Sequence, residues 1–360
     1  MIDPVVTASG QNYEKDYITD WLMNANTCPH TGAVLSDLSV RPNLLVNDLI
    51  EEWCQAEKYD RRFNQKVTEL DIDGLESLLH RISSASSVSD QTEAANELRR
   101  QITNFARVGD LFFSQLPDSI TRMLTPLSGE VFLSNTDLQE NIITSLFNIS
   151  VNEKNRTVIA QNSLAIEVLT KSLWLGTDHK QRKSASTLWV LSVIDSNKDN
   201  IGNSKAPVAL VHLIKKGDSV ATRAAAFAVC NIFTVLENRQ RPIAAGFISE
   251  LIKQMRERKD ADGFLLARLA SISTETGVIE EMENLEFIRD LMIILRQSSG
   301  VIAQNAIVIL FEMCKTNKGR LGQLKIEENQ HETFTKLAAQ GTQIAVQTAE
   351  AILQWLKTLG

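Results

Sequence analysis

The chain has 360 residues, of which 43% are hydrophobic and 22% are charged, as in ordinary globular proteins. It contains no run of about 18 apolar residues, and polar residues interrupt its start, so the sequence argues against a membrane span and a signal peptide. Residues 1–60 hold ten acidic and three basic side chains, whereas residues 61–360 hold 34 of each. A neutral region without a basic stripe argues against nucleic-acid binding, and we expect a cytoplasmic or nuclear protein.

The first sixty residues differ in pattern from the rest of the chain. In chain order they predict a short hairpin, a helix, a polar loop and a second helix, at Asp3–Val6 with the turn after it, Glu14–Met23, Asn26–Gly32 and Leu44–Cys54. These elements form a small α+β domain over residues 1–57. Its acidic charge either steers a basic partner surface toward it or belongs to a solvated face.

Residues 58–70 are charged and lack periodicity, which predicts a linker. From residue 71 to residue 360 the pattern is helical throughout. Helix breaks are predicted at nearly even spacing, at Gly109, Pro117, Gly129, Gly176, Gly217, Gly263, Gly300 and Gly341. Even spacing of this kind is typical of a repeat protein.

The helical region contains an internal repeat. Ser145–Ser150 reads S-L-F-N-I-S, Thr187–Ser192 reads T-L-W-V-L-S, and Val229–Phe233 reads V-C-N-I-F, each followed at matching offsets by an asparagine and a basic residue. The period of about 41–42 residues lies in the armadillo and HEAT range, with two or three helices per repeat. Around Leu265–Ser273 the register is blurred. We predict a mainly α protein in which residues 71–360 form an armadillo superhelix.

The residues that carry chemistry in enzymes are scattered. The four cysteines, Cys28, Cys54, Cys230 and Cys314, form no C-x-x-C pair and have no histidine at a spacing that suits zinc. We expect them to be reduced, structural thiols. The five histidines lie near no cysteine or carboxylate cluster in the sequence, and no glycine loop suits a phosphate. The sequence therefore predicts no metal, no cofactor and no covalent nucleophile.

Several motifs of the first sixty residues occur together in a fixed order. They are D-P-V-V (Asp3–Val6), S-G-Q-N-Y-E (Ser9–Glu14), I-T-D-W-L (Ile18–Leu22), T-C-P-H-T (Thr27–Thr31) and R-P-N-L-L-V-N-D-L-I-E-E-W-C (Arg41–Cys54). With the repeats behind them, they resemble the plant U-box ubiquitin ligases of the armadillo-repeat type. The resemblance implies a U-box, which is similar in fold to a RING domain but holds no zinc, followed by an armadillo-repeat superhelix.

The resemblance implies a ubiquitin-protein ligase. In this family the U-box docks a ubiquitin-conjugating enzyme charged with ubiquitin and orients the thioester for attack by a substrate lysine. The helix residue of the docking surface matches Trp21, which is equally a core residue, and the loop proline matches Pro29. The family's first docking loop precedes the D-P-V motif and is expected to be missing, which weakens docking by about tenfold or more. The alternative function is a non-catalytic armadillo scaffold with an inert U-box.

The resemblance also implies a substrate groove lined by the third helix of each repeat. The family's inner-helix asparagine position is occupied by Asn148 and Asn231, and neighbouring repeats have Val190 and Glu312 there; Trp189 packs nearby. An asparagine in this position pairs with the backbone of an extended peptide through its donor and its acceptor, or it satisfies helix carbonyls or water. The partners implied are a charged conjugating enzyme and a protein substrate.

Overall fold

The computed structural model describes residues 1, 3–56, 68–84, 87–116, 118–128, 135–216, 219–257 and 263–358. The backbone divides into two units, Met1–Thr68 and Glu69–Gly360. The linker predicted over residues 58–70 lies outside the described residues as far as residue 67. Among the residues that the structure describes, no helix is long and apolar enough to cross a membrane.

The amino-terminal unit contains a three-stranded antiparallel sheet and two helices. Strand β1 (Pro4–Val6) lies between β2 (Asn12–Glu14) and β3 (Arg41–Pro42) in this sheet. Helix α1 (Lys15–Asn24) follows β2, and helix α2 (Leu44–Ala56) follows β3. The predicted hairpin and both predicted helices are therefore present.

Few side chains are buried in this unit. Val5, Ile18 and Cys28 are at most 1% exposed and form its centre. The apolar residues predicted at helical spacing on α2 do lie on one helix, but Leu45 is 71% exposed and Trp53 is 57% exposed. The unit is thus held by backbone pairing and side-chain hydrogen bonds more than by a large core.

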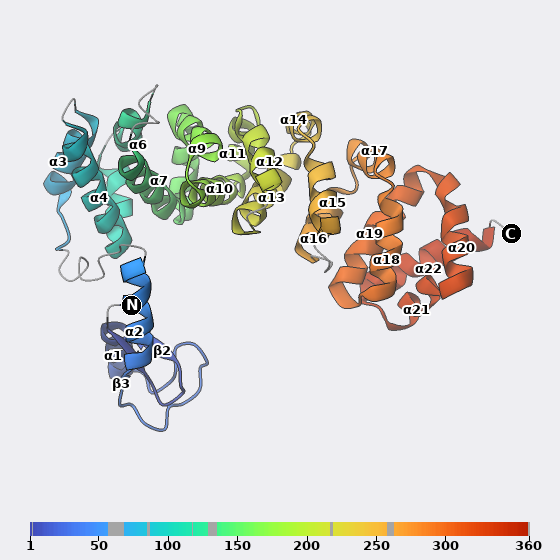
Figure 1. Ribbon diagram of the computed structural model, residues 1–360, viewed down its shortest axis with the longest axis horizontal. Helices are drawn as coiled ribbons and strands as arrows, with labels where there is room; N and C mark the ends of the chain where they lie inside the picture. Colours follow the sequence, from blue (N-terminus) through green and yellow to red (C-terminus); the bar gives the residue numbers. More distant parts are fainter. Residues whose placement is uncertain are drawn as a thin grey trace. The chain divides into compact units, whose positions relative to one another are not determined.

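In the described part of the second unit, the regular elements are all helices, and they follow one another in sets of three (Figure 1). The helices are α3 (Ile72–Ser83), α4 (Val88–Asn104), α5 (Ala106–Ser114), α6 (Ser119–Leu124), η2 (Thr125–Leu127), α7 (Thr136–Ser150), α8 (Glu153–Gln161), α9 (Ser163–Leu175), α10 (Asp178–Ser192), α11 (Asp195–Gly202), α12 (Ala206–Lys216), α13 (Ser219–Phe233), η4 (Leu236–Asn238), α14 (Gln240–Ala244), α15 (Phe247–Glu257), α16 (Gly263–Ile272), α17 (Thr276–Asn284), α18 (Phe287–Gln297), α19 (Gly300–Thr316), η5 (Lys318–Arg320), α20 (Leu321–His331), α21 (Thr333–Gln340) and α22 (Gln343–Thr358).

The third helices of successive repeats pack against one another in one row. This row consists of α4, α7, α10, α13, α16, α19 and α22, and we call its surface the third-helix face. The second helices α3, α6, α9, α12 and α15 form another row, which Figure 1 shows on the other side of the same repeats. One continuous apolar core runs from Leu75 to Leu356, so each repeat completes its core with the next one.

The repeated asparagines hold successive helices together. The Asn155 amide donates to the carbonyl of Ile149 at 3.2 Å, and the Asn197 amide donates to that of Leu191 at 3.0 Å. Both carbonyls lie in the last turn of a third helix, where carbonyl groups have no partner within the helix. The asparagine that recurs in the sequence is therefore a structural element of the repeat.

Most predicted helix breaks that fall on described residues lie at helix ends. Gly176 and Gly341 separate helices, and Gly263 and Gly300 begin them. The break predicted at Gly109 was wrong, because this glycine lies inside α5. Its neighbour Val108 is fully buried, and such packing outweighs the low helix propensity of glycine, about 1 kcal/mol. The breaks predicted at residues 117, 129 and 217 lie outside the described residues.

Candidate functional site

Trp21 and Pro29 come from neighbouring parts of the amino-terminal unit. The indole Nε1 of Trp21, on α1, donates to the carbonyl of Thr27 at 2.8 Å. The Trp21 side chain is 38% exposed, and Pro29, two residues beyond Thr27, is half-buried. The hydrogen bond therefore ties the helix to the loop and leaves part of both side chains at the surface.

A hydrogen-bond network around Cys28 shapes the loop that carries Pro29. The Cys28 sulfur lies 3.0 Å from the Tyr13 hydroxyl, and that hydroxyl accepts from the His30 backbone N–H at 3.2 Å. Burial, and then the contact with Cys28, raises the pKa of the Tyr13 hydroxyl, which therefore stays neutral. Gly32 closes the turn with a φ of 70°, a conformation that favours glycine. The loop is thus fixed by protein groups alone.

Among the described residues, no group of three or more histidine, cysteine, aspartate or glutamate side chains is arranged to hold a metal ion. The four cysteines are free and buried. Burial raises the pKa of Cys230 and Cys314 to about 12, which makes both thiols unreactive. Burial also raises the pKa of Cys28, but hydrogen bonds from neighbouring hydroxyl groups lower it to about 6. Cys28 is only 1% exposed, which agrees with the structural role expected for it.

The asparagines predicted to contact a substrate lie on third helices and bridge to the preceding third helix. The Asn148 amide donates to the Thr103 hydroxyl at 3.0 Å, and the Asn231 amide donates to the Ser192 hydroxyl at 3.1 Å. No described residue donates to the amide oxygen of either asparagine. The donors are therefore used within the protein, whereas the acceptors remain available to a ligand.

An aromatic run crosses three third helices. Trp189 on α10 stacks on Phe227 on α13, with ring centroids 4.5 Å apart, and Phe227 meets Phe264 on α16 edge-on at 4.8 Å. The guanidinium of Arg268 lies 4.5 Å from the centroid of the Phe227 ring, and that of Arg223 lies 4.7 Å from the centroid of Phe264. Of these residues, only Trp189 was predicted from the sequence.

The remaining predicted residues also lie on third helices. Val190 is half-buried beside Trp189 on α10. Glu312, on α19, pairs with Lys315 one turn later, at 3.2 Å. All five predicted substrate residues thus belong to the third-helix face, but the contacts link only Trp189 to the aromatic run.

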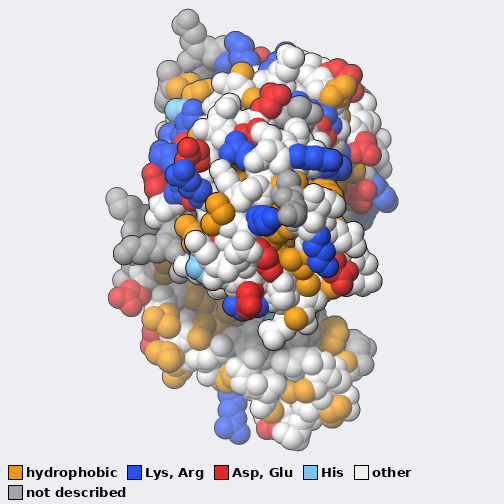
Figure 2. Space-filling view, turned by 90° about the vertical axis from the view of Figure 1, so that its right-hand side faces the viewer, with side chains coloured by type: hydrophobic (Ala, Val, Ile, Leu, Met, Phe, Trp, Pro, Cys, Tyr) orange, Lys and Arg blue, Asp and Glu red, His pale blue; other side chains and the backbone are white. Residues whose placement is uncertain are grey.

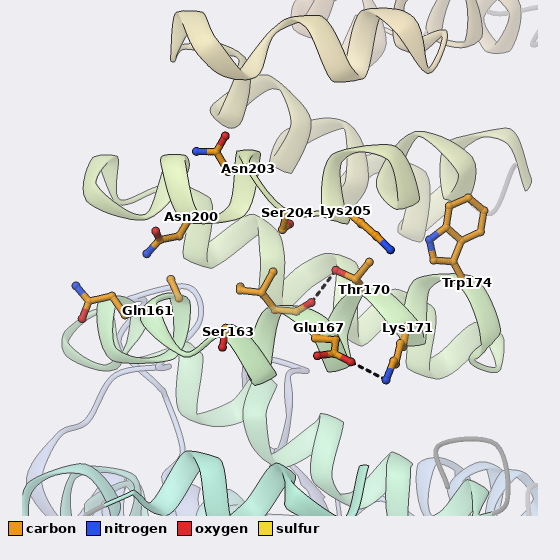
Figure 3. Close-up of a pocket in the computed structure, with 12 residues that line it drawn as sticks. Gln161, Ser163, Glu167, Thr170, Lys171, Trp174, Asn200, Asn203, Ser204 and Lys205 are labelled. Atoms are coloured by element: carbon orange, nitrogen blue, oxygen red, sulfur yellow. Dashed lines mark hydrogen bonds and ion pairs between the residues drawn. The ribbon is translucent and has the colours of Figure 1, made fainter. Parts of the chain in front are cut away.

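A pocket of about 620 Å³ lies away from the third-helix face, between α9 and the junction of α11 and α12 (Figure 3). Lys171 points along its wall and pairs with Glu167 at 2.7 Å. Trp174 stands at one end near Lys205, and the imidazole of His212 packs on its ring with centroids 4.3 Å apart. The carboxylate of Glu167 thus already forms an ion pair with Lys171 in the pocket wall.

The charges of the armadillo unit are mixed where its carboxy-terminal end faces the viewer. Figure 2 shows basic and acidic side chains interspersed there among apolar ones. This agrees with the balanced count of charges after residue 60. The balanced total therefore does not show whether a single helix carries an excess of one charge.

The U-box domain family model matches residues 1–59. U-box domain-containing protein 46 of Arabidopsis thaliana is 50% identical, over 99% of this chain and 79% of its own length. The chain belongs to the plant U-box proteins. U-box domain-containing protein 47 of the same plant is 42% identical, over 99% of this chain and 82% of its own length. The family predicted from the motifs is confirmed.

Designed armadillo-repeat proteins are among the solved structures that resemble this U-box protein. A designed armadillo repeat protein matches with a TM-score of 0.52 and 17% identity, over 66% of this chain and 99% of its own. A second, solved in complex with the peptide (KR)4, matches with a TM-score of 0.50 and 16% identity, over the same shares. The predicted fold, an armadillo-repeat α-structure preceded by a U-box, is confirmed.

Proposed function

We propose that this U-box protein is a ubiquitin-protein ligase that recruits a ubiquitin-conjugating enzyme through Trp21 and Pro29. Membership of a ubiquitin ligase family supports the activity. The observation that carries the docking site is the hydrogen bond from Trp21 to the Thr27 carbonyl, which ties the helix residue to the proline loop. A rigid, partly exposed tryptophan beside a proline is a typical anchor of a protein interface.

Such a ligase needs no nucleophile of its own. The substrate amine attacks the thioester carbonyl, an amide bond forms, and the cysteine thiolate of the conjugating enzyme leaves. Holding the two reactants in place supplies the acceleration, and orientation contributes up to about 7–11 kcal/mol in well-arranged systems.

The third-helix face is the proposed substrate site of the same protein. It combines half-buried aromatic rings with amide oxygens that are not used internally. A designed armadillo protein of the same fold was solved with a bound peptide, which supports a peptide-binding role for this face. The first proposal concerns the U-box and the second concerns the repeats, so each is tested separately.

Discharge of ubiquitin from charged conjugating enzymes to free lysine tests the U-box proposal. Pro29→Ala removes a proposed anchor from the loop and should slow discharge by about tenfold or more. Pro42→Ala is the matched control, because Pro42 is an exposed proline on β3, and it should leave the rate unchanged. Equal rates for wild type and Pro29→Ala would refute the docking site. Absence of discharge with every conjugating enzyme in a broad panel would leave the scaffold function instead.

A further inference from the structure

Many cations of the armadillo unit are paired with carboxylates. On the first and second helices and the turns between them, arginines form ion pairs with carboxylates: Arg122 with Glu76 at 2.7 Å, Arg256 with Asp290 at 2.6 Å, Arg296 with Glu327 at 2.6 Å, and Arg239 with Glu275. These arginines are neutralised within the protein. They therefore have little charge to offer a ligand.

On the third helices, Arg100 and Lys315 also pair with carboxylates, but three other cations pair with no described carboxylate. Lys183 on α10 places its Nζ 4.3 Å from the centroid of the Phe147 ring, and Arg268 on α16 lies over Phe227. Neither forms an ion pair with a carboxylate of the described residues. Arg99 on α4 also lacks such a pair and donates only to the Asn96 side chain, at 2.9 Å. Three cations of the third-helix face thus keep most of their donors unused.

The burial of these cations without charged partners among the described residues is energetically unfavourable. Lys183, Arg99 and Arg268 are half-buried, and the Nε atoms of both arginines are buried without a hydrogen-bond partner. Burial, and then repulsion by Arg99, lowers the pKa of the Lys183 ammonium, and a weaker attraction by Glu140 opposes this shift. Two like charges, on α4 and α10, therefore act on each other across the intervening α7. An anion bound at this face would relieve the repulsion and satisfy the free donors.

The middle of the third-helix face is basic in composition as well. Helix α13 and helix α16 contain no acidic residue, and their charged side chains are Arg223 and Arg268. Helix α10 has Lys180, Arg182 and Lys183 against one aspartate. These three helices therefore carry more basic than acidic side chains, although the repeat region as a whole is neutral.

We propose that the third-helix face selects an acidic peptide segment, rich in aspartate or glutamate, bound in an extended form. Its carboxylates bind Lys183 and Arg268, and its backbone N–H groups donate to the amide oxygens of Asn148 and Asn231. Its apolar groups pack on the aromatic run formed by Trp189, Phe227 and Phe264. This inference rests on the proposed substrate-binding role of the face and names the class of substrate.

Fluorescence anisotropy of labelled peptides with the full chain tests the proposal. Three short peptides share one sequence of alanine and tyrosine and differ only in carrying glutamate, glutamine or lysine at alternate positions. We expect the glutamate peptide to bind about tenfold or more tightly than the glutamine peptide, and to weaken as salt is added. The lysine peptide should bind least.

The double variant Lys183→Gln with Arg268→Gln should weaken binding of the glutamate peptide by about tenfold or more. Lys253→Gln matches the net charge of each single variant and is their control, because Lys253 lies on α15, a second helix, and it should have no effect. Circular dichroism checks the fold, and the two single variants carry the test if the double variant unfolds.

Equal binding of the glutamate and glutamine peptides would overturn the proposal, and so would tighter binding of the lysine peptide. A loss of affinity in Lys253→Gln equal to that of the double variant would also overturn it. The ligase proposal is judged independently, since discharge to free lysine needs no peptide substrate. Binding of the lysine peptide with normal discharge would reject only the acidic class of ligand.

Discussion

At the scale of single residues, Asn148 and Asn231 each use one half of their amide within the protein. Replacing both with alanine removes two acceptors from the third-helix face, and a peptide N–H left unpaired in the complex costs about 1–3 kcal/mol. We expect the double variant to bind the glutamate peptide about tenfold or more weakly in the anisotropy assay. Circular dichroism should show unchanged helicity, since alanine favours helix.

The same substitutions also break the bonds to Thr103 and Ser192, so a matched control is needed. Thr103→Ala with Ser192→Ala breaks those bonds and keeps both asparagines. This control should lose some stability and retain binding. If it lost as much affinity as the asparagine variant, the asparagines would act only by joining helices, and their role as peptide ligands would be rejected.

Some of these residues could be predicted from sequence patterns and others could not, because periodicity marks the residues that pack between repeats. Trp189, Asn148 and Asn231 lie in the repeated motif, whose residues recur because every repeat packs on the next. Phe227 lies outside that motif on α13, the helix of Asn231, and Arg268 lies on α16, where the repeat register was blurred. Residues that contact a ligand differ from repeat to repeat, so periodicity does not mark them. Their role emerges only from the ring contacts between helices.

At the scale of elements, Gly202 shows why one repeat departs from the others. The equivalent residues Ala160 and Ala244 have a Cβ, but at Gly202 an added Cβ would lie 2.1 Å from the Asn238 side chain. Asn238 is held there by its hydrogen bond to the Lys198 carbonyl at 3.0 Å. Gly202→Ala should therefore destabilise the protein by about 1–3 kcal/mol, measured as a lower urea midpoint.

Gly109→Ala is the natural comparison for this prediction. Gly109 lies within α5, and an added Cβ there would meet nothing within 4 Å. Alanine is a better helix former than glycine, so this variant should raise the urea midpoint, by roughly 0.5–1 kcal/mol in stability. A midpoint raised by both substitutions would contradict the close packing assigned to Gly202.

The elements themselves were largely predictable. The hairpin, α1 and α2 follow from short-range periodicity and turn residues, and the repeats follow from their spacing. The register around Leu265–Ser273 was not predictable, because no asparagine and basic residue follow α16 as they follow α7, α10 and α13. The exposure of Leu45 on α2 was not predictable either. Periodicity shows which residues share one side of a helix, but it does not show what covers that side.

At the scale of the whole molecule, the number of charged residues does not show how much charge is available to a ligand, because many of these residues are paired. After residue 60 the chain is neutral, which argued against nucleic-acid binding. Many arginines of the first and second helices, however, form ion pairs within the protein. Lys183 and Arg268 on the third helices form no ion pair with a described carboxylate. Pairing depends on contacts between residues distant in sequence. For that reason the charge available to a ligand is a property of the fold and not of the composition.

The central claim assigns ubiquitin transfer to the U-box and substrate selection to the third-helix face. Ubiquitination of a glutamate-rich peptide with one lysine, run beside discharge to free lysine, tests this division. Pro29→Ala should slow both reactions by about tenfold or more. Lys183→Gln with Arg268→Gln should slow only the peptide reaction, by a similar factor. Undiminished ubiquitination of the peptide in either variant would contradict the account. So would an equal slowing of both reactions by Lys183→Gln with Arg268→Gln.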